Sequence, residues 1–219
     1  MIITILPKQY KNILHLFYDN HNSPLHLREI SRRINLRESA LSRHLNKLEK
    51  NGILKSEKEA NLKKYSIRKQ EIPGIFQIFD EEKLESLPLI RKNAIKEYLK
   101  ALQNKPIILI VFGFTAKGIY TKDLDIGLLH IYSKNADTEA ARLHAEALTG
   151  IKPQVFRISE EQFYKELIEK QDHVIQAAIA TGFSAFNSRY FYELKYDERA
   201  VPSPVTNRRQ GTGKKDKRI

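Results

Sequence analysis

The stretch Leu36-Arg-Glu-Ser-Ala-Leu-Ser-Arg-His-Leu-Asn-Lys-Leu-Glu-Lys-Asn-Gly-Ile-Leu54 decides the fold of the N-terminal part of the chain. Its apolar residues recur at helical spacing, with Leu41, Leu45 and Leu48 at positions i, i+4 and i+7. Gly52 is well placed to end this helix, because glycine tolerates the left-handed conformation common after helix C-termini. The spacing predicts a helix over about 37–51 that buries its leucines and exposes a basic opposite face.

Two more helices and a hairpin are predicted around this helix. Apolar residues recur at helical spacing over 10–18, and a second such stretch covers about 24–35. Residues 53–57 and 64–67 alternate like two short strands. The intervening residues 58–63 are expected to form the loop of a β-hairpin.

Three helices and a hairpin in this order resemble the winged helix-turn-helix domain of many prokaryotic regulators. The resemblance implies that the leucines pack on the preceding helices while the opposite face enters the DNA major groove. The outward residues expected to contact DNA are Arg37, Ser39, Ser42, Arg43, Asn46 and Lys47. Arg37 stands where a capping Ser or Thr is often found, so the cap is expected either at Asn35 or to be weak.

The residue types on this face suit double-stranded DNA. Arg37 or Arg43 can bind a guanine edge through two hydrogen bonds, and Ser42 and Asn46 suit bases or phosphates. The wing lysines expected to meet backbone phosphate, which gives affinity but little sequence information, are Lys58, Lys63 and Lys64. Two alternatives stay open: a merely solvated basic helix face, and a winged helix that binds protein or RNA.

The formal net charge of +12 over 219 residues is unevenly distributed. Residues 1–70 carry +9, residues 71–196 carry −1 and residues 197–219 carry +4. This partition predicts a DNA-binding domain over 1–70 and a second domain of different purpose. Residues 197–219 show no apolar period, so a disordered basic tail is predicted, which either adds non-specific phosphate contacts or aids solubility.

Composition excludes several classes of protein. Cysteine is absent, which rules out disulfides, thiolate zinc sites and cysteine nucleophiles. The longest apolar run, residues 107–112, is far short of the roughly 18 residues that span a bilayer. These features predict a cytoplasmic protein with no membrane partner.

Residues 71–106 are expected to be a linker, Ile72-Pro73-Gly74, followed by connecting helices. An apolar stripe runs from Leu84 to Leu102, and Pro88 is expected to start a new helix within it. Such a helix either forms a dimer interface beside the wing or is the first helix of the next domain.

The segment from Ile107 to Tyr132 resembles the motif of minimal nucleotidyltransferases, members of the DNA polymerase β superfamily. A buried strand, 107–112, precedes a glycine turn and a second apolar strand. The resemblance implies a small α/β domain with a mixed sheet over 107–196, so the whole chain is assigned to the α+β class. The remaining predicted elements are helices over 138–148, 160–169 and 173–180, strands over 154–158 and 181–186, and a terminal helix through 196.

The resemblance assigns a degenerate nucleotide site to Gly113, Phe114, Lys117, Asp123, Asp125, Gly127 and Gln154. In the family, a Gly-Ser turn holds phosphate, and two carboxylates at i and i+2 with a third on a later strand bind Mg²⁺. Here Phe114 replaces the serine, Gly127 replaces the second aspartate, and Gln154 stands where the third carboxylate is expected. The expectation is a domain with no catalytic residues and no metal ligands, and with Mg²⁺ as cofactor only if the site is active.

One displaced site is conceivable, because Asp123 and Asp125 also stand at i and i+2. The leading hypothesis is a sequence-specific transcriptional regulator of prokaryotic, archaeal type. It binds duplex DNA as a homodimer, and its second domain serves in dimerisation, sensing of a possible nucleotide ligand, or partner binding. The alternative is an active nucleotidyltransferase that modifies protein, RNA or a small molecule, with the winged helix for substrate binding or autoregulation.

Overall fold

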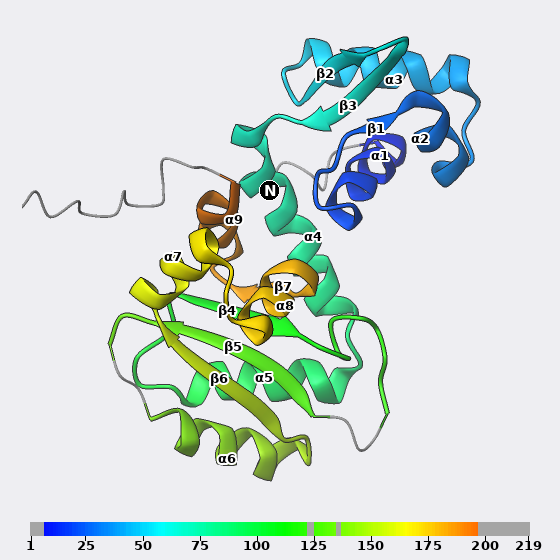
Figure 1. Cartoon of the computed structure of the whole chain (residues 1–219). Coiled ribbons are helices and arrows are strands. Elements are labelled where there is room, and N and C mark those ends of the chain that lie inside the picture. Colours follow the sequence, from blue (N-terminus) through cyan, green and yellow to red (C-terminus); the bar gives the residue numbers. More distant parts are fainter. Residues whose placement is uncertain (1–6, 122–124, 135–136, 197–219) are drawn as a thin grey trace, which may run out of the picture.

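A computed structural model describes residues 7–121, 125–134 and 137–196 of the chain. It has a smaller N-terminal region and a larger α/β region, and helix α4 runs from one to the other (Figure 1). The predicted tail over 197–219 and the predicted metal aspartate Asp123 lie outside the described residues.

The N-terminal region is a three-helix core closed by a small sheet. Its elements are α1 (Lys8–Asp19), β1 (Leu25–His26), α2 (Leu27–Ile34), α3 (Glu38–Lys50), β2 (Leu54–Glu59) and β3 (Leu62–Ile67). The sheet is antiparallel with the order β1-β3-β2. The three leucines of α3 are buried against α1, α2 and the sheet, as their spacing predicted. This arrangement agrees with a helix-turn-helix followed by a wing.

The hairpin is longer than the sequence predicted. Strands β2 and β3 pair from Leu54↔Ile67 out to Glu59↔Leu62, which leaves only two residues for the turn. The prediction of a loop over 58–63 was therefore wrong, because the tip of the hairpin is exposed on both faces and shows no apolar alternation. The short strand β1 was not predicted, since two residues carry no period.

The linker predicted at Ile72-Pro73-Gly74 is instead the first turn of α4 (Ile72–Ser86), which follows a short 3₁₀ helix at Lys69–Glu71. Proline is compatible with a first turn because its missing N–H has no intrahelical acceptor there. Ile75, Phe76 and Phe79 of α4 are buried in the same core as α1. The two regions are thus joined by a packed helix.

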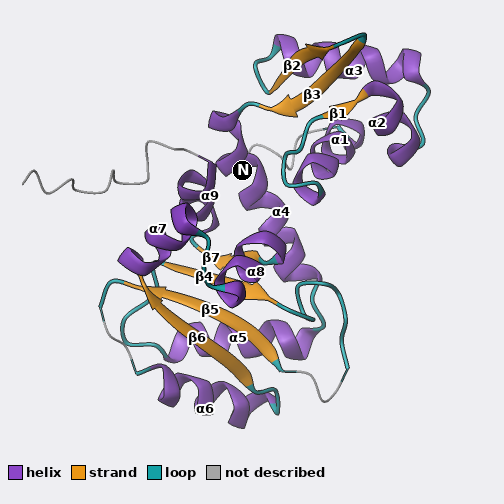
Figure 2. Ribbon diagram, viewed as in Figure 1, coloured by secondary structure: helices purple, strands orange, loops and turns teal. Residues whose placement is uncertain are grey.

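The larger region is a four-stranded mixed sheet covered by helices on both faces (Figure 2). Its elements are α5 (Leu89–Ala101), β4 (Ile108–Phe112), β5 (Ile126–Tyr132), α6 (Thr138–Thr149), β6 (Pro153–Ser159), α7 (Glu160–Glu169), α8 (His173–Thr181), β7 (Phe183–Phe186) and α9 (Ser188–Tyr196). The strand order is β6-β5-β4-β7, with only β5 and β6 parallel. The mixed sheet agrees with the expected fold class.

Side-chain alternation divides the core of this region into two layers. Leu109, Val111 and Leu128 point to the layer that contains α5 and α6. Ile110 and Leu129 point to the opposite layer with α7, α8 and α9. Since α5 is buried against the sheet, it is the first helix of this region, one of the two roles left open by the sequence.

The predicted start of α7 is confirmed by a reciprocal cap. The Ser159 side chain accepts a hydrogen bond from the Gln162 backbone N–H at 3.1 Å, and the Gln162 side chain accepts one from the Ser159 N–H at 3.0 Å.

Candidate nucleic-acid interface

The turn before α3 is held by the backbone rather than by a side-chain cap. Asn35 has a φ of 51° and ends α2 in the left-handed conformation, so the alternative that Asn35 caps α3 was wrong. Arg37 is the N-cap residue and its side chain makes no capping hydrogen bond, which confirms the weak cap. The Ser31 hydroxyl donates to the Leu36 carbonyl at 2.6 Å and fixes the turn between the two helices.

The face of α3 opposite its leucines is open to solvent. Ser39, Arg43 and Asn46 follow at i, i+4 and i+7 and are exposed. Exposed Arg37 and Lys47 and half-buried Ser42 complete the predicted set. None of the carboxylates in the described ranges lies within ion-pair distance of these cationic groups, so their donors are available to an anionic partner.

Two residues of α3 contact Tyr10 of α1. The His44 ring meets the Tyr10 ring edge-on, with 5.2 Å between centroids, so this histidine packs against α1. The Lys47 amine lies 5.9 Å from the same Tyr10 ring. Tyr10 of α1 therefore supports this side of α3.

The wing is attached to α3 through Glu49. Its carboxylate accepts hydrogen bonds from the Ser56 hydroxyl on β2 and from the Lys63 amine on β3, the latter at 2.8 Å. These hydrogen bonds hold the pKa of Glu49 below its usual range. Glu49 thus fixes the hairpin relative to α3.

The three predicted wing lysines do not share one face of the hairpin. Lys58 and Lys63 are cross-strand partners, so they lie on the face that carries the buried Leu54 and Tyr65. Lys64 lies on the other face, where it pairs with Glu59. In the described part of the chain Lys58 has no carboxylate within ion-pair distance, so it is the wing lysine best placed for phosphate.

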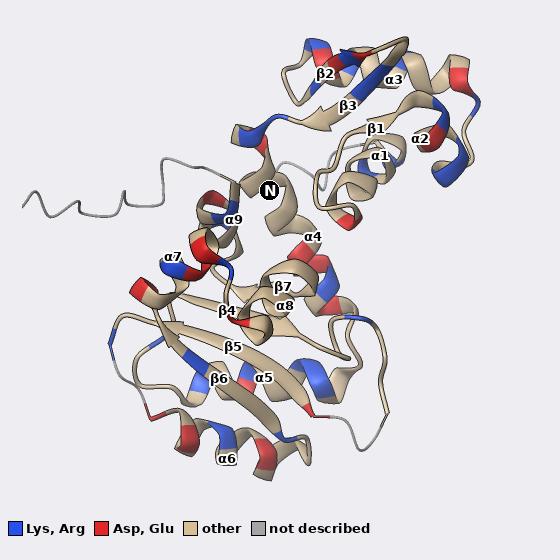
Figure 3. Cartoon of the chain, in the orientation of Figure 1, with Lys and Arg blue, Asp and Glu red and all other residues tan. Residues whose placement is uncertain are grey.

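Arg28 of α2 was missed by the sequence analysis. It is 80% exposed and lies 3.8 Å from Glu38 in the first turn of α3, next to Arg37. Lys and Arg residues occur on α2, α3 and both wing strands (Figure 3). The basic run on α2 was visible in the sequence, but only the contact with Glu38 places Arg28 beside the recognition helix.

The sheet places two positions of the predicted nucleotide site, Gly127 and Gln154, beside Phe112, which was not part of that prediction. Phe112, Gly127 and Gln154 are neighbours across β4, β5 and β6, so they share one face. A Cβ on Gly127 would lie 3.1 Å from the Phe112 carbonyl oxygen and 3.3 Å from its ring. The ring also packs on Phe156, with 5.5 Å between centroids. Phe112 therefore crowds the space that a side chain at 127 would need.

The loop between β4 and β5 is held by α5. Gly113 opens it with a φ of 73°, which glycine adopts without strain. The buried guanidinium of Arg91 donates to the Thr115 hydroxyl at 3.0 Å and to the Thr121 carbonyl at 2.7 Å. Phe114 is 53% exposed and Lys117 is also exposed.

Among the residues that the structure describes, which exclude Asp123, the donors at this place do not suit Mg²⁺. Asp125 supplies a carboxylate just before β5, but Gln154 is neutral and Gly127 has no side chain. Magnesium prefers several anionic oxygens, so this set lacks both ligands and charge. In the described ranges, no three His, Cys, Asp or Glu side chains lie close enough to hold a metal ion.

A buried carboxylate, Asp80 of α4, joins the two regions. Its oxygens accept hydrogen bonds from the hydroxyls of Tyr18 at 2.7 Å and Tyr192 at 2.9 Å, from the Ser184 N–H at 2.9 Å, and from the Ser188 hydroxyl. Burial raises its pKa to about 6, because the loss of water outweighs the four hydrogen bonds. No sequence pattern indicated this cluster.

The described ranges contain no helix that is both long and apolar enough to cross a membrane. Comparison with curated proteins and with solved structures gives no match. Residues 11–56, from α1 into β2, match the model of the family described as bacterial regulatory protein, arsR family. The N-terminal part of the chain is therefore similar to the helix-turn-helix of arsR-family regulators, and this similarity supports a DNA-binding transcriptional regulator.

Proposed function

We propose that the protein is a sequence-specific transcriptional regulator that places α3 in the major groove of an operator. The single observation that carries this proposal is the open face of α3, where Arg37, Arg43 and Asn46 stand exposed on a helix whose other side is buried. Arginine and asparagine are the side chains that bind guanine and adenine edges through paired hydrogen bonds. The match to the arsR family over the same helix supports the proposal.

The wing contributes affinity rather than sequence selection. Glu49 holds the hairpin against α3, and Lys58 stands on the same face of the hairpin as the residues that contact α3. A lysine in that position reaches the phosphates that flank the groove in which α3 lies. The chain acts as a homodimer, so two recognition helices meet half-sites about 34 Å apart on a roughly palindromic operator.

The α/β region serves in dimerisation, ligand sensing or partner binding and has a nucleotidyltransferase-like fold without its reaction. The crowding of Gly127 by Phe112 supports this part of the proposal, because a metal-binding carboxylate has no room there without a shift of the ring or of β4.

Selection of genomic fragments bound by the full-length protein tests the proposal. Enrichment of a common, nearly palindromic sequence is expected. Binding to that sequence should weaken about 10³-fold to 10⁵-fold between about 50 and about 200 mM salt if roughly 6 to 10 phosphates are contacted. Recovery of unrelated fragments with no shared sequence would contradict sequence-specific recognition.

A further inference from the structure

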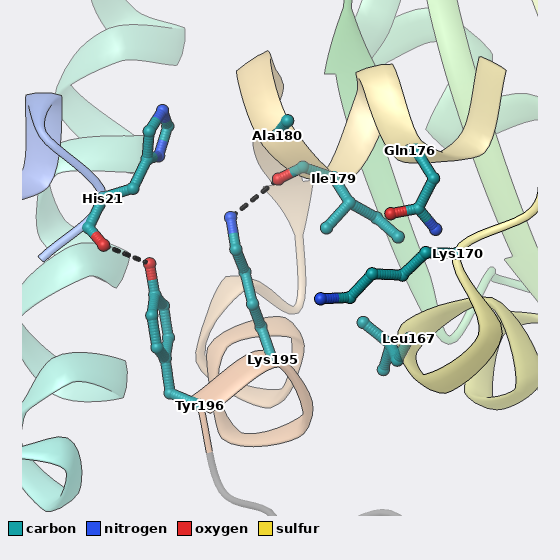
Figure 4. A pocket seen from close by; sticks show the side chains of 8 residues that line it. All are labelled: His21, Leu167, Lys170, Gln176, Ile179, Ala180, Lys195 and Tyr196. Atoms are coloured by element: carbon teal, nitrogen blue, oxygen red, sulfur yellow. Dashed lines mark hydrogen bonds between the residues drawn. The ribbon is translucent and has the colours of Figure 1, made fainter. Parts of the chain in front are cut away.

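A cavity of about 400 Å³ lies where the end of α1 meets α8 and α9 (Figure 4). His21 lines it from the N-terminal region, and Lys170, Gln176, Lys195 and Tyr196 line it from the larger region. A neighbouring hollow of about 200 Å³ shares His21 and Lys195. The two spaces together form a junction cavity whose walls come from both regions.

The walls of the junction cavity are tied together across the two regions. The Tyr196 hydroxyl donates to the His21 carbonyl at 3.3 Å. The Lys195 amine donates to the Ile179 carbonyl at 2.7 Å. Lys170 extends into the same space from the end of α7 (Figure 4). The cavity is thus bounded by side chains that are already positioned.

The junction cavity has more positive than negative groups on its walls. Lys83 lines the smaller hollow, and Lys170 and Lys195 line the larger one. No carboxylate in the described ranges lies within ion-pair distance of these three amines. Asp80 is nearby, but its oxygens already accept four hydrogen bonds. Asp19 also lines the smaller hollow, and its carboxylate is paired with His15 at 2.9 Å.

The proximity of these cations has electrostatic consequences. Burial lowers the pKa of Lys195 to about 8 and also lowers the pKa of Lys83. The pKa of His21 is lowered by burial and by the charges of Lys195 and Lys83. The charge of Asp80 opposes the shift at both lysines but does not cancel it. Positive groups that are partly desolvated are stabilised when an anion enters between them.

We propose that the junction cavity binds a small molecule that bears phosphate groups. Lys83, Lys170 and Lys195 contact its phosphate oxygens, and Gln176 and Tyr196 contact the remainder of the ligand. Lysine is a compact charge with three donors and commonly binds phosphate. Because the cavity has walls from both regions, its occupant also contacts the end of α1 and so reaches the DNA-binding region.

The site is independent of the proposed DNA recognition, but duplex DNA offers the same phosphate chemistry. The test therefore uses two arms with the full-length protein: calorimetric titration with pyrophosphate, and binding of random-sequence duplex DNA at the same ionic strength. Lys195→Ala and Lys83→Ala remove cavity charges. Lys96→Ala is the matched control, because Lys96 lies on α5 and pairs with Glu85 at 2.8 Å.

Wild type is expected to bind pyrophosphate, and each cavity variant to bind it about tenfold more weakly, the effect of losing one hydrogen bond to a charged group. The control should bind like wild type. Absence of binding to wild type, or an equal loss in the control, would overturn the proposal. If the cavity variants lose duplex affinity as strongly as pyrophosphate affinity, the cavity holds DNA phosphate and the small-molecule proposal is overturned.

A second variant guards against loss of folding. Lys170 is exposed at the end of α7, so Lys170→Glu should leave the thermal unfolding midpoint unchanged while it weakens pyrophosphate binding by more than tenfold. Unchanged pyrophosphate affinity in a folded Lys170→Glu protein would exclude Lys170 from the site and overturn the proposed arrangement.

Discussion

The exposed face of α3 and the position of Gly127 on β5 were both marked by family resemblance as places of function, and they differ in what surrounds them. On α3, Arg43 and Asn46 project into solvent from a helix anchored by buried leucines. On β5, the Phe112 ring crowds Gly127, the position that would need a carboxylate. A resemblance in sequence is informative about chemistry only where the fold leaves room for the ligand and supplies its partners.

Replacement of Asp80 tests whether the N-terminal region and the α/β region are stabilised as one unit. Replacement by Ala leaves four buried donors without acceptors, so the free energy of unfolding should fall by about 3 kcal/mol or more, measured by urea denaturation. Asp125→Ala is the control, since this exposed carboxylate should change stability by less than about 0.5 kcal/mol. A loss below about 1 kcal/mol for Asp80→Ala would show that the junction contributes little.

Gly127→Asp supplies the carboxylate that β5 lacks at this position. We expect a loss of about 1–3 kcal/mol in stability and no gain of Mg²⁺ binding, because the new Cβ lies 3.1 Å from the Phe112 carbonyl. Gly74→Ala is the control, since nothing lies within 4 Å of its added Cβ. If the Gly127→Asp protein is stable and binds Mg²⁺, this position of β5 has space for a metal site.

Arg43→Ala tests the open face of α3. Affinity for the selected operator should fall by about 1–3 kcal/mol, with relaxed preference at one base pair, as measured by fluorescence anisotropy. Arg189→Ala on α9 removes an exposed arginine that is paired with Glu193 at 3.0 Å and should leave affinity unchanged. Equal effects of the two substitutions would indicate general electrostatics rather than recognition by α3.

The stability of the protein should depend on pH through the junction of the two regions, where Asp80 is buried, and not through the exposed face of α3. The pKa of Asp80 in the folded protein, about 6, is above its ordinary value of 3.8. Its contribution to stability is therefore complete below pH 3.8 and is lost as the pH rises through 6. The stability of wild type relative to Asp80→Asn should therefore fall by about 1 kcal/mol from about pH 5 to about pH 7. A rise over this interval would contradict the direction of the pKa shift.

The smallest effect is expected from a substitution in the wing, where Lys58 and Lys55 lie on opposite faces of β2. Lys58→Ala should reduce the slope of log affinity against log salt by about 1, because one phosphate contact is lost. Lys55→Ala is the control on the opposite face of the same strand, where Lys55 pairs with Glu57 at 2.6 Å. A larger change of slope for Lys55 would place the DNA on the other face.

Local periodicity was sufficient to predict helices and strands that have one buried face. The spacing of Leu41, Leu45 and Leu48 predicted α3 and its exposed side, and the helix predicted over 160–169 has the bounds of α7. The same reasoning failed at Ile72-Pro73-Gly74, since a proline and a glycine are equally compatible with a linker and with a first helical turn.

The junction could not be predicted, because its contacts depend on the tertiary fold. Asp80 lies on an amphipathic helix in a position that resembles any surface aspartate until the hydroxyls of Tyr18 and Tyr192 are brought to it. The lysines of the junction cavity likewise belong to three different helices or their ends. A single sequence records neither association.

The position of Asp80 along the chain has a consequence for the order of folding. Its donors Tyr18 and Tyr192 lie 62 and 112 residues away, on opposite sides of it in the sequence. During synthesis the helix-turn-helix and wing can complete their mostly local contacts early, whereas Asp80 gains its last hydrogen-bond donors, Ser188 and Tyr192, only after α9 has left the ribosome. Until α9 is available, the Asp80 carboxylate on α4 remains hydrated. Docking of the two regions is therefore expected to be the final and slowest step in the folding of a newly made chain.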